Sequence, residues 1–245
     1  MYPIIYYICK MILQEIKQAL KDLSDEQRAT FSLKYFKANK GEYAEGDQFI
    51  GVTVPDQRQV AKAFWQTVSL EEIKQLLQSE IHEHRLTALL MLVLKFEKTP
   101  PKRKELVDFY LSNLEGVNNW DLVDTSAYKL LGRYCFDNDA EYLLDSLANS
   151  KNLWHNRIAV VSMLYYIRKK QYTLPQKLIL KHLNHPHDLM HKANGWMLRE
   201  LGKRNEEVLL EFLKQHYTAM PRTTLRYAIE KLDEPLRQDF LNGKI

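Results

Sequence analysis

The sequence has few of the residues that break regular structure and few that cross-link it. Its 245 residues include only eight glycines, eight prolines and two cysteines, Cys9 and Cys135. Two isolated cysteines exclude a disulfide framework and a cysteine-based zinc finger, and they favour a reducing compartment such as the cytoplasm. The scarcity of glycine and proline encodes few tight turns, which favours a mainly helical chain.

Long hydrophobic runs and a strong net charge are also missing. The apolar N-terminal stretch MYPIIYYICK is about ten residues long, whereas a membrane span needs ~20, and it lacks the features of a signal peptide. We therefore expect no membrane partner, interpret residues 1–10 as an appendage or alternative start, and assign residues 11–245 to a single domain. The net charge of +4 permits nucleic-acid binding without requiring it.

Helical periodicity is nearly continuous from Ile12 onward, with apolar residues at steps of three and four. Short polar or proline-marked segments interrupt it, among them residues 150–152, 173–175, 185–186, 220–221 and 233–235. Only the segment YAEGDQFIGVTVP, residues 43–55, is expected to be looped or extended. These patterns predict an all-α chain of short helices with almost no strand.

A small residue recurs on a similar apolar register in five of the predicted helices: Ala88, Ala127, Ala159, Gly195 and Ala228. The steps between them are roughly 32 to 39 residues, close to the length of the two-helix unit of HEAT-like solenoids. A small side chain would let the paired helix approach closely. We therefore predict an α-solenoid, a superhelix of HEAT-like two-helix repeats whose concave surface suits a long ligand.

The segment VNNWDLVDTSA, residues 117–127, places Trp120 four residues before Asp124. On a helix this spacing puts the ring and the carboxylate on one face, with Asp124 at the border of the buried stripe. One of the two preceding asparagines can cap the helix, and Asp121 suits its first turn. Asp124 is then either an acid paired with a neighbour, which spacing alone favours, or a reactive carboxylate beside an aromatic ring.

Two later segments carry further candidates. Arg157 stands early in a predicted helix at the edge of its core, where it can pair with a carboxylate or hold a phosphate through two hydrogen bonds. Trp196 follows Gly195 directly, and ordinary core packing would also explain it. Because these residues and the Trp120–Asp124 pair occupy equivalent regions of three successive units, stacked repeats would bring them to one face. Indole faces attract cations, and a carboxylate stabilises positive charge that develops in a transition state.

Basic residues are frequent in the C-terminal half, and most are explained as solvated faces. Arg222 and Arg226, in MPRTTLRYAIEKL, are better candidates for phosphate contacts because two threonines at a helix start could assist them. The segment KHLNHPHDLMH has histidines at zinc-binding spacings, which leaves a metal-dependent hydrolase as an alternative. Pro186 interrupts the helix between the histidines and no HExxH motif occurs, so we expect neither a metal nor another cofactor.

Five stretches together resemble the AlkD-like DNA alkylation repair family: FIGVTVPDQRQVAKAF, NNWDLVD, NLWHNRIAVVSMLYYIR, HKANGWMLRELGKR and MPRTTLRYAIEKL. The resemblance runs from roughly Ile12 to Leu241, with the motifs in order. It implies a monofunctional DNA glycosylase with a concave DNA-binding groove, which removes cationic purines alkylated at N3 or N7, such as 3-methyladenine and 7-methylguanine, without inserting the base in a pocket. By this resemblance Asp124 is the catalytic aspartate, Trp120 and Trp196 are groove tryptophans, and Arg157 is the active-site arginine.

One departure from the family pattern precedes Arg157, where this chain has His155 and Asn156 in place of a more charged pair. The competing interpretation is a non-catalytic HEAT-like module that binds DNA structure or protein, because the fold alone supports scaffolding. A pure adaptor has no need of the tryptophan, aspartate and arginine set. We therefore expect a cytoplasmic, nucleoid-associated monomer whose partner is double-stranded DNA containing alkylated bases.

Overall fold

The computed structural model describes residues 2–245, with side chains from Met11 onward. The N-terminal helix α1 runs Tyr2–Asp22, and the interpretation of residues 1–10 as an appendage lies outside the described side chains. Within the described range the regular structure is helical, and the β pairing there is one isolated bridge between Gln48 and Ile81. The predicted all-α class is therefore confirmed.

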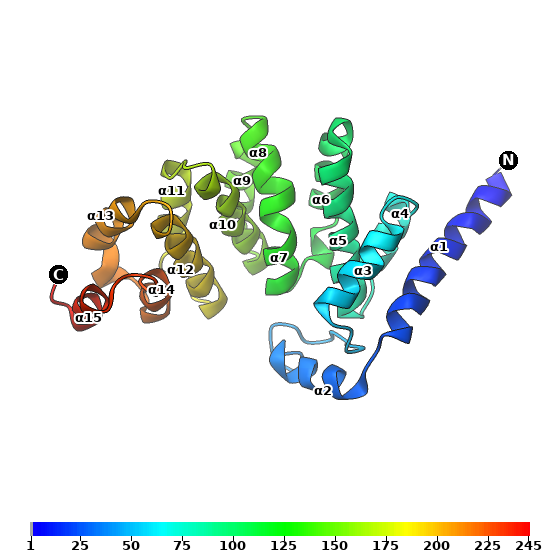
Figure 1. The fold of residues 1–245 in the computed structure, drawn as a ribbon, viewed down its shortest axis with the longest axis horizontal. Coiled ribbons are helices and arrows are strands. Elements are labelled where there is room, and N and C mark those ends of the chain that lie inside the picture. Colours follow the sequence, from blue (N-terminus) through cyan, green and yellow to red (C-terminus); the bar gives the residue numbers. More distant parts are fainter. Residues whose placement is uncertain (1) are drawn as a thin grey trace. The chain divides into compact units, whose positions relative to one another are not determined.

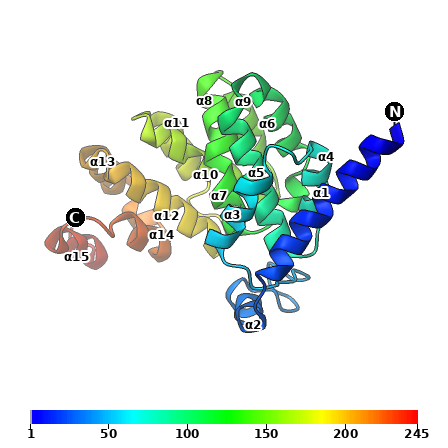
Figure 2. The ribbon, with the colours of Figure 1, turned by 45° about the vertical axis from the view of Figure 1, so that its right-hand side comes forward.

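The chain forms two compact units, the first of which ends at Ser126. Besides α1 it contains α2 (Glu26–Tyr35), α3 (Val54–Phe64), α4 (Leu70–Leu77), α5 (His82–Lys98), α6 (Arg103–Leu111) and all but the last residue of α7 (Trp120–Ala127). Helix α5 is buried almost all round, since α3 and α4 both pack against it and α1 runs beside α3 (Figures 1 and 2). This is the pairwise helix packing that the repeat pattern predicts.

The loop of residues 36–53 joins α2 to α3 and confirms the looped segment expected there. Its far end is held by Glu83, whose carboxylate accepts the backbone N–H of Gly51 at 2.8 Å. Gly51 has φ +77°, and a Cβ added to it would lie 2.1 Å from the carbonyl oxygen of Asp25. Only glycine fits this position, so the loop passes directly against the start of α2.

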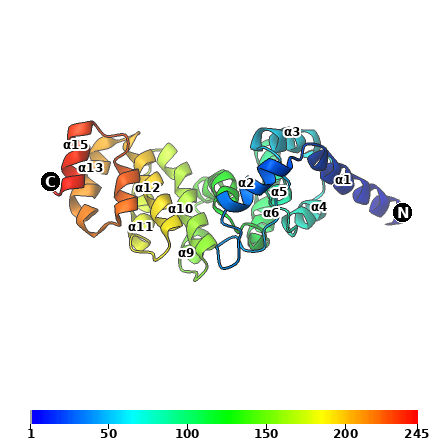
Figure 3. The same cartoon turned by 90° about the horizontal axis from the view of Figure 1, so that it is seen from below.

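The second unit begins at Ala127. It contains α8 (Arg133–Asp137), α9 (Glu141–Ala148), α10 (Leu153–Arg168), α11 (Thr173–Lys181), α12 (Asp188–Gly202), α13 (Glu206–His216), α14 (Arg222–Ala228) and α15 (Glu234–Asn242). Helix α10 packs against α9 and α12 (Figure 3), and α12 also packs against α14. The helix starts after residues 152, 187, 221 and 233 agree with the breaks expected from the sequence.

The recurring small residues lie where helices approach closely. All four alanines of the set are buried. A Cβ added to Gly195 would lie 2.4 Å from the Cβ of Tyr227 and 2.7 Å from the carbonyl oxygen of Thr224, because α14 crosses directly over it. The expected reason for the small residue is therefore confirmed at this position.

A turn of π-helix, Tyr128–Gly132, follows α7 without a break and leads into α8. A Cβ on Gly132 would lie 2.3 Å from the carbonyl oxygen of Ser162 on α10, and the Ser162 hydroxyl donates to the Ala127 carbonyl at 3.4 Å. Such turns concentrate at functional sites in helices. Here the π-turn accommodates the close approach of α10.

Candidate functional site

Helix α7 begins at Trp120, and the predicted cap is made by Asn119. Its side-chain oxygen accepts the backbone N–H of Trp120 at 2.8 Å, while one carboxylate oxygen of Asp121 accepts the N–H of Leu122 at the same distance. Both Trp120 and Asp124 are half-buried, so they lie at the border of the core as their spacing predicted. The first unit therefore presents an indole and a carboxylate on neighbouring turns of one helix.

Two aromatic residues at the end of α2 extend the surface around Trp120. Its indole stacks on Phe36, with ring centroids 5.4 Å apart, and meets the edge of Tyr35 at 5.9 Å. The Tyr35 ring is 54% exposed and stacks in turn on the exposed ring of Phe31. Sequence reasoning missed these residues, and the adjacent aromatic pair in LKYFK was the available signal.

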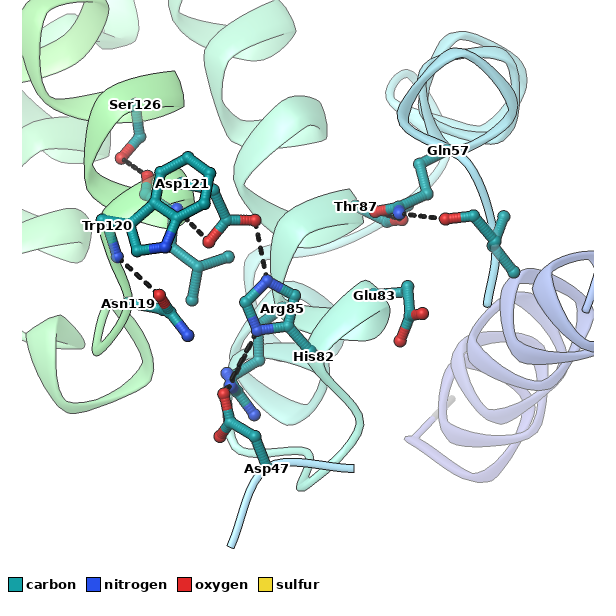
Figure 4. Close-up of polar contacts among 12 residues, drawn as sticks. Asp47, Gln57, His82, Glu83, Arg85, Thr87, Asn119, Trp120, Asp121 and Ser126 are labelled. Atoms are coloured by element: carbon teal, nitrogen blue, oxygen red, sulfur yellow. Dashed lines mark hydrogen bonds and ion pairs between the residues drawn. The ribbon is translucent and has the colours of Figure 1, made fainter. Parts of the chain in front are cut away.

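Beneath this surface lies a buried cluster of charged residues from three elements (Figure 4). The two ring nitrogens of His82, at the start of α5, lie 2.8 Å from Asp121 Oδ2 and 3.2 Å from Asp47 Oδ2. Arg85 Nη2 lies 2.7 Å from the same oxygen of Asp47. Sequence reasoning assigned Asp121 only a role in the first turn of α7, and it missed the other three.

The charged groups of this cluster stabilise one another's ionised forms. Burial alone would lower the pKa of His82, but the charge and hydrogen bond of Asp121, with the hydrogen bond of Asp47, raise that pKa to about 9. Burial likewise tends to raise the pKa of Asp47, and the hydrogen bond of His82 and the charge of Arg85 outweigh it, so this pKa is below its ordinary value. His82 is therefore an imidazolium at neutral pH.

Arg157, on α10, is only 4% exposed and lies at the N-terminal end of α12. Its guanidinium donates to the carbonyl of Leu189, a residue in the first turn of α12. His187 caps that turn, with Nδ1 accepting the backbone N–H of Leu189 at 3.1 Å. A guanidinium beside the positive end of a helix makes a local field that favours an anion.

Trp196 is half-buried on α12 and follows the tightly packed Gly195. Helices α10 and α12 are neighbours, so the second unit holds Arg157 and Trp196 on adjacent helices. Trp120 and Asp124 belong to the first unit. The four candidates are thus divided between the units, and their convergence on one surface stays a prediction.

The basic residues of the second unit fall into two groups. Ion pairs hold Lys192 to Asp188, Arg199 to Glu230, and both Lys203 and Arg204 to Glu200, which supports the interpretation as solvated faces. On α14, by contrast, Arg222 donates to the Leu241 carbonyl at 3.1 Å and both Arg222 and Arg226 are exposed. Thr224 is fully buried and donates to the carbonyl of His191, so the expectation that it helps to hold a phosphate is wrong.

The histidine-rich segment forms the turn between α11 and α12. His185 Nδ1 accepts the backbone N–H of His187 at 3.1 Å, and His191 Nε2 donates to the His185 carbonyl at 2.6 Å. Among the residues that the structure describes, no group of three or more His, Cys, Asp or Glu side chains is placed to hold a metal ion. From residue 2 onward, none of the helices combines the length and apolar character of a membrane span.

The residues that depart from the family pattern before Arg157 have structural partners. Asn156 is buried, and its amide donates to the carbonyls of Leu147 and Ser150 at 3.0 and 2.9 Å, which ties the end of α9 to α10. His155 Nδ1 lies 3.0 Å from the Ser150 hydroxyl. The departure therefore belongs to the packing between these two helices.

Comparisons with known proteins agree with this architecture. A family model described as DNA alkylation repair enzyme matches residues 16–232. A solved structure titled as a predicted DNA alkylation repair enzyme from Enterococcus faecalis is similar with a TM-score of 0.66 and 19% identity, covering 86% of this chain and 97% of that one. The crystal structure of AlkD2 from Streptococcus mutans is similar with a TM-score of 0.54 and 18% identity, covering 85% and 99%.

At 19% and 18% identity, the two structures show only that the fold is shared. The family model, by contrast, matches most of the sequence of this chain. No curated protein matches the chain significantly. The matched range includes α7, with Trp120 and Asp124, and the two helices that carry Arg157 and Trp196. The chain belongs to the family of DNA alkylation repair enzymes.

Proposed function

We propose that this family member is a monofunctional DNA glycosylase, which hydrolyses the N-glycosidic bond of cationic N3- or N7-alkylated purines in duplex DNA. The observation that carries the proposal is the pairing of Trp120 with Asp124 on α7, where both residues are half-buried and the indole of Trp120 lies against the exposed ring of Tyr35. Aromatic faces attract a cationic nucleotide, and the carboxylate lies one helical turn from the indole. A scaffold would need neither feature.

The chemistry suits a single carboxylate. A purine alkylated at N3 or N7 already carries positive charge, so it departs as a neutral base without protonation by a general acid. As the C1′–N bond breaks, its electron pair goes to the purine and the sugar becomes oxocarbenium-like. Asp124 stabilises that positive charge and accepts a proton from the water that attacks C1′, as carboxylates do in other glycosidic cleavages.

The second unit supplies the contacts to the backbone in this proposal. Arg157, with the N-terminus of α12, holds a phosphate next to the lesion, because a buried guanidinium and a helix N-terminus both favour an anion. Trp196 lies against the sugar-phosphate side of the nucleotide. Arg222 and Arg226, exposed on α14, contact phosphates farther along the duplex.

The test is to incubate the protein with duplex DNA methylated at purine nitrogens and to identify the released bases by chromatography. Release of 7-methylguanine or 3-methyladenine is the expected result. Trp196→Phe should slow release, whereas Trp154→Phe, a change at a half-buried tryptophan outside the proposed site, should leave it unchanged. Tight binding of methylated DNA without any released base would contradict the glycosylase and favour a non-catalytic DNA-binding module.

A further inference from the structure

The buried charge cluster beneath Trp120 takes no part in the proposed chemistry. His82 is 2% exposed, Arg85 is 4% exposed, and the carboxylates of Asp47 and Asp121 are also shielded from solvent. Burying several charges is expensive unless each one is paired. The cluster joins the loop of residues 36–53 and α5 to α7, the helix that begins with Trp120.

His82 reaches Trp120 by two routes. The first is its contact with Asp121, the residue that follows Trp120 in the first turn of α7. The second is its ring, which lies against Phe36 and Phe49, with centroids 4.8 and 5.0 Å away, and Phe36 is the ring on which Trp120 stacks. A cation beside two aromatic faces is attracted by both. His82 therefore contacts both the residue next to Trp120 and the ring on which the Trp120 indole stacks.

We propose that His82, held between Asp47 and Asp121, is a positioning residue that fixes the Trp120 ring and the first turn of α7. Its effect on base release rests on the proposed glycosylase function, whereas its effect on the placement of Trp120 does not. The two can therefore be measured separately.

The charge of His82 is essential to this role. An imidazolium donates from both ring nitrogens, one to Asp121 and one to Asp47, whereas a neutral ring has a single N–H. When His82 loses its proton, one carboxylate faces a ring lone pair. Among the side chains that the structure describes, the other charged group recorded against the ring is Arg85, whose Nη2 lies 3.4 Å from Nδ1 and already pairs with Asp47. One of the two carboxylate contacts therefore loses its hydrogen bond, and both lose the attraction of the imidazolium charge, which weakens the link between His82 and the first turn of α7.

A matched control stands two residues away on the same helix. His84 is buried like His82, but its ring bonds the Ser79 hydroxyl at 2.9 Å and touches neither acid. Burial, with the charges of Lys17 and Arg85, lowers its pKa to about 4, so it is neutral where His82 is charged. Replacing His84 removes a buried imidazole without removing a charge from the cluster.

The test observes Trp120 directly. The full-length protein is labelled with 5-fluorotryptophan, its Trp120 fluorine resonance is assigned from Trp120→Phe, and the resonance is followed from about pH 6 to about pH 10. We expect the Trp120 resonance to shift with a midpoint near 9, to lose that transition in His82→Gln, and to keep it in His84→Gln. A Trp120 resonance that does not titrate, or that titrates unchanged in His82→Gln, overturns the proposal.

A second variant covers the case in which His82→Gln does not fold. Asp121→Asn keeps the shape of the side chain that contacts His82 and removes its negative charge. The pH midpoint of the Trp120 resonance shift should therefore fall by about one pH unit or more. An unchanged midpoint would contradict the proposed contact.

Base release gives the functional measurement. At neutral pH, His82→Gln should lower the rate of release about tenfold at saturating DNA, and His84→Gln should not. If the wild-type protein releases no base while Trp120 titrates as described, the glycosylase proposal fails and the positioning role of His82 stands. Equal release by His82→Gln and wild-type protein would contradict the functional role of His82.

Discussion

The indole of Trp120 stacks on the phenyl ring of Phe36, with 5.4 Å between the ring centroids and 20° between the ring planes. Phe36 directly follows α2, and Trp120 opens α7, so this contact joins two elements that are far apart in the sequence. Aromatic pairs add roughly 0.5–1.5 kcal/mol to the stabilisation that comes from burial. The aromatic side of the candidate site is therefore assembled by tertiary packing.

Phe36→Ala should remove the support for the Trp120 ring. We expect the free energy of unfolding to fall by about 1–3 kcal/mol, less than for a fully buried phenylalanine, and the affinity for methylated DNA to fall with it. Urea unfolding and a DNA titration measure the two effects. Phe31→Ala, at a ring that is 66% exposed, is the control, and it should change the unfolding free energy by no more than about 0.5 kcal/mol. Equal losses of stability in both variants would contradict this account.

Gly195→Ala should destabilise the protein although alanine is the better helix former. The added Cβ would lie 2.4 Å from the Cβ of Tyr227 and 2.7 Å from a backbone carbonyl, so α14 must move away from α12. The expected net loss is about 1–3 kcal/mol in the free energy of unfolding, measured in urea. Gly202→Ala, at the end of the same helix, should cost less, because its Cβ meets a side chain and no backbone: the terminal Cδ2 of Leu209, at 2.3 Å, would have to move. If Gly195→Ala proved as stable as Gly202→Ala, the close approach of α14 would be refuted.

The stability of the protein should decrease in mild acid because two buried histidines are neutral. Burial is the main cause that lowers the pKa values of His84 and His182 to about 4. In the unfolded chain they take up protons near pH 6.5, so the stability they contribute is complete above pH 6.5 and is lost as the pH falls toward 4. Each contributes a slope of up to about 1.4 kcal/mol per pH unit in that window.

Unfolding free energies measured between about pH 5 and about pH 7 check this prediction, because most carboxylates stay ionised there. His84→Gln should reduce the slope by up to about 1.4 kcal/mol per pH unit, while His216→Gln, at a half-exposed ring, should leave it in place. The same slope in wild-type protein and in His84→Gln would contradict the assignment.

The two exposed arginines of α14 should act on DNA through charge alone. Arg222→Gln and Arg226→Gln should each reduce the slope of log affinity against log salt by about 0.9, uniformly across DNA sequences. Arg237→Gln is the control, since its guanidinium is already paired with Glu234 at 2.8 Å. An unchanged salt dependence in both variants would show that neither arginine of α14 contacts a DNA phosphate.

Features encoded by neighbouring residues could be predicted from the sequence. The start of α7 at Trp120, the loop before α3 and the close packing at Gly195 all follow from local signals, namely a cap, turn residues and a small side chain. The half-buried position of Asp124 follows from helical periodicity. Its catalytic role was suggested by family resemblance, because spacing alone favoured an ordinary ion pair.

Features that join distant segments could not be predicted. His82 lies 35 residues from Asp47 and 39 from Asp121, and no spacing rule connects positions so far apart. Asp121 does have the helix-start role that the sequence predicts, because one of its oxygens accepts a backbone N–H of the first turn. Its other oxygen meets His82, and only the fold shows this. The π-turn after α7 likewise depends on α10, which arrives some thirty residues later in the chain.

The central claim is that the Asp124 carboxylate stabilises the sugar as the base leaves, and Asp124→Asn tests it most directly. The substitution keeps the shape and removes the charge. Release of 7-methylguanine from methylated duplex DNA should fall by about 10²–10³ or more, with the affinity for the same DNA unchanged. Release at the wild-type rate by Asp124→Asn would remove this carboxylate from the mechanism.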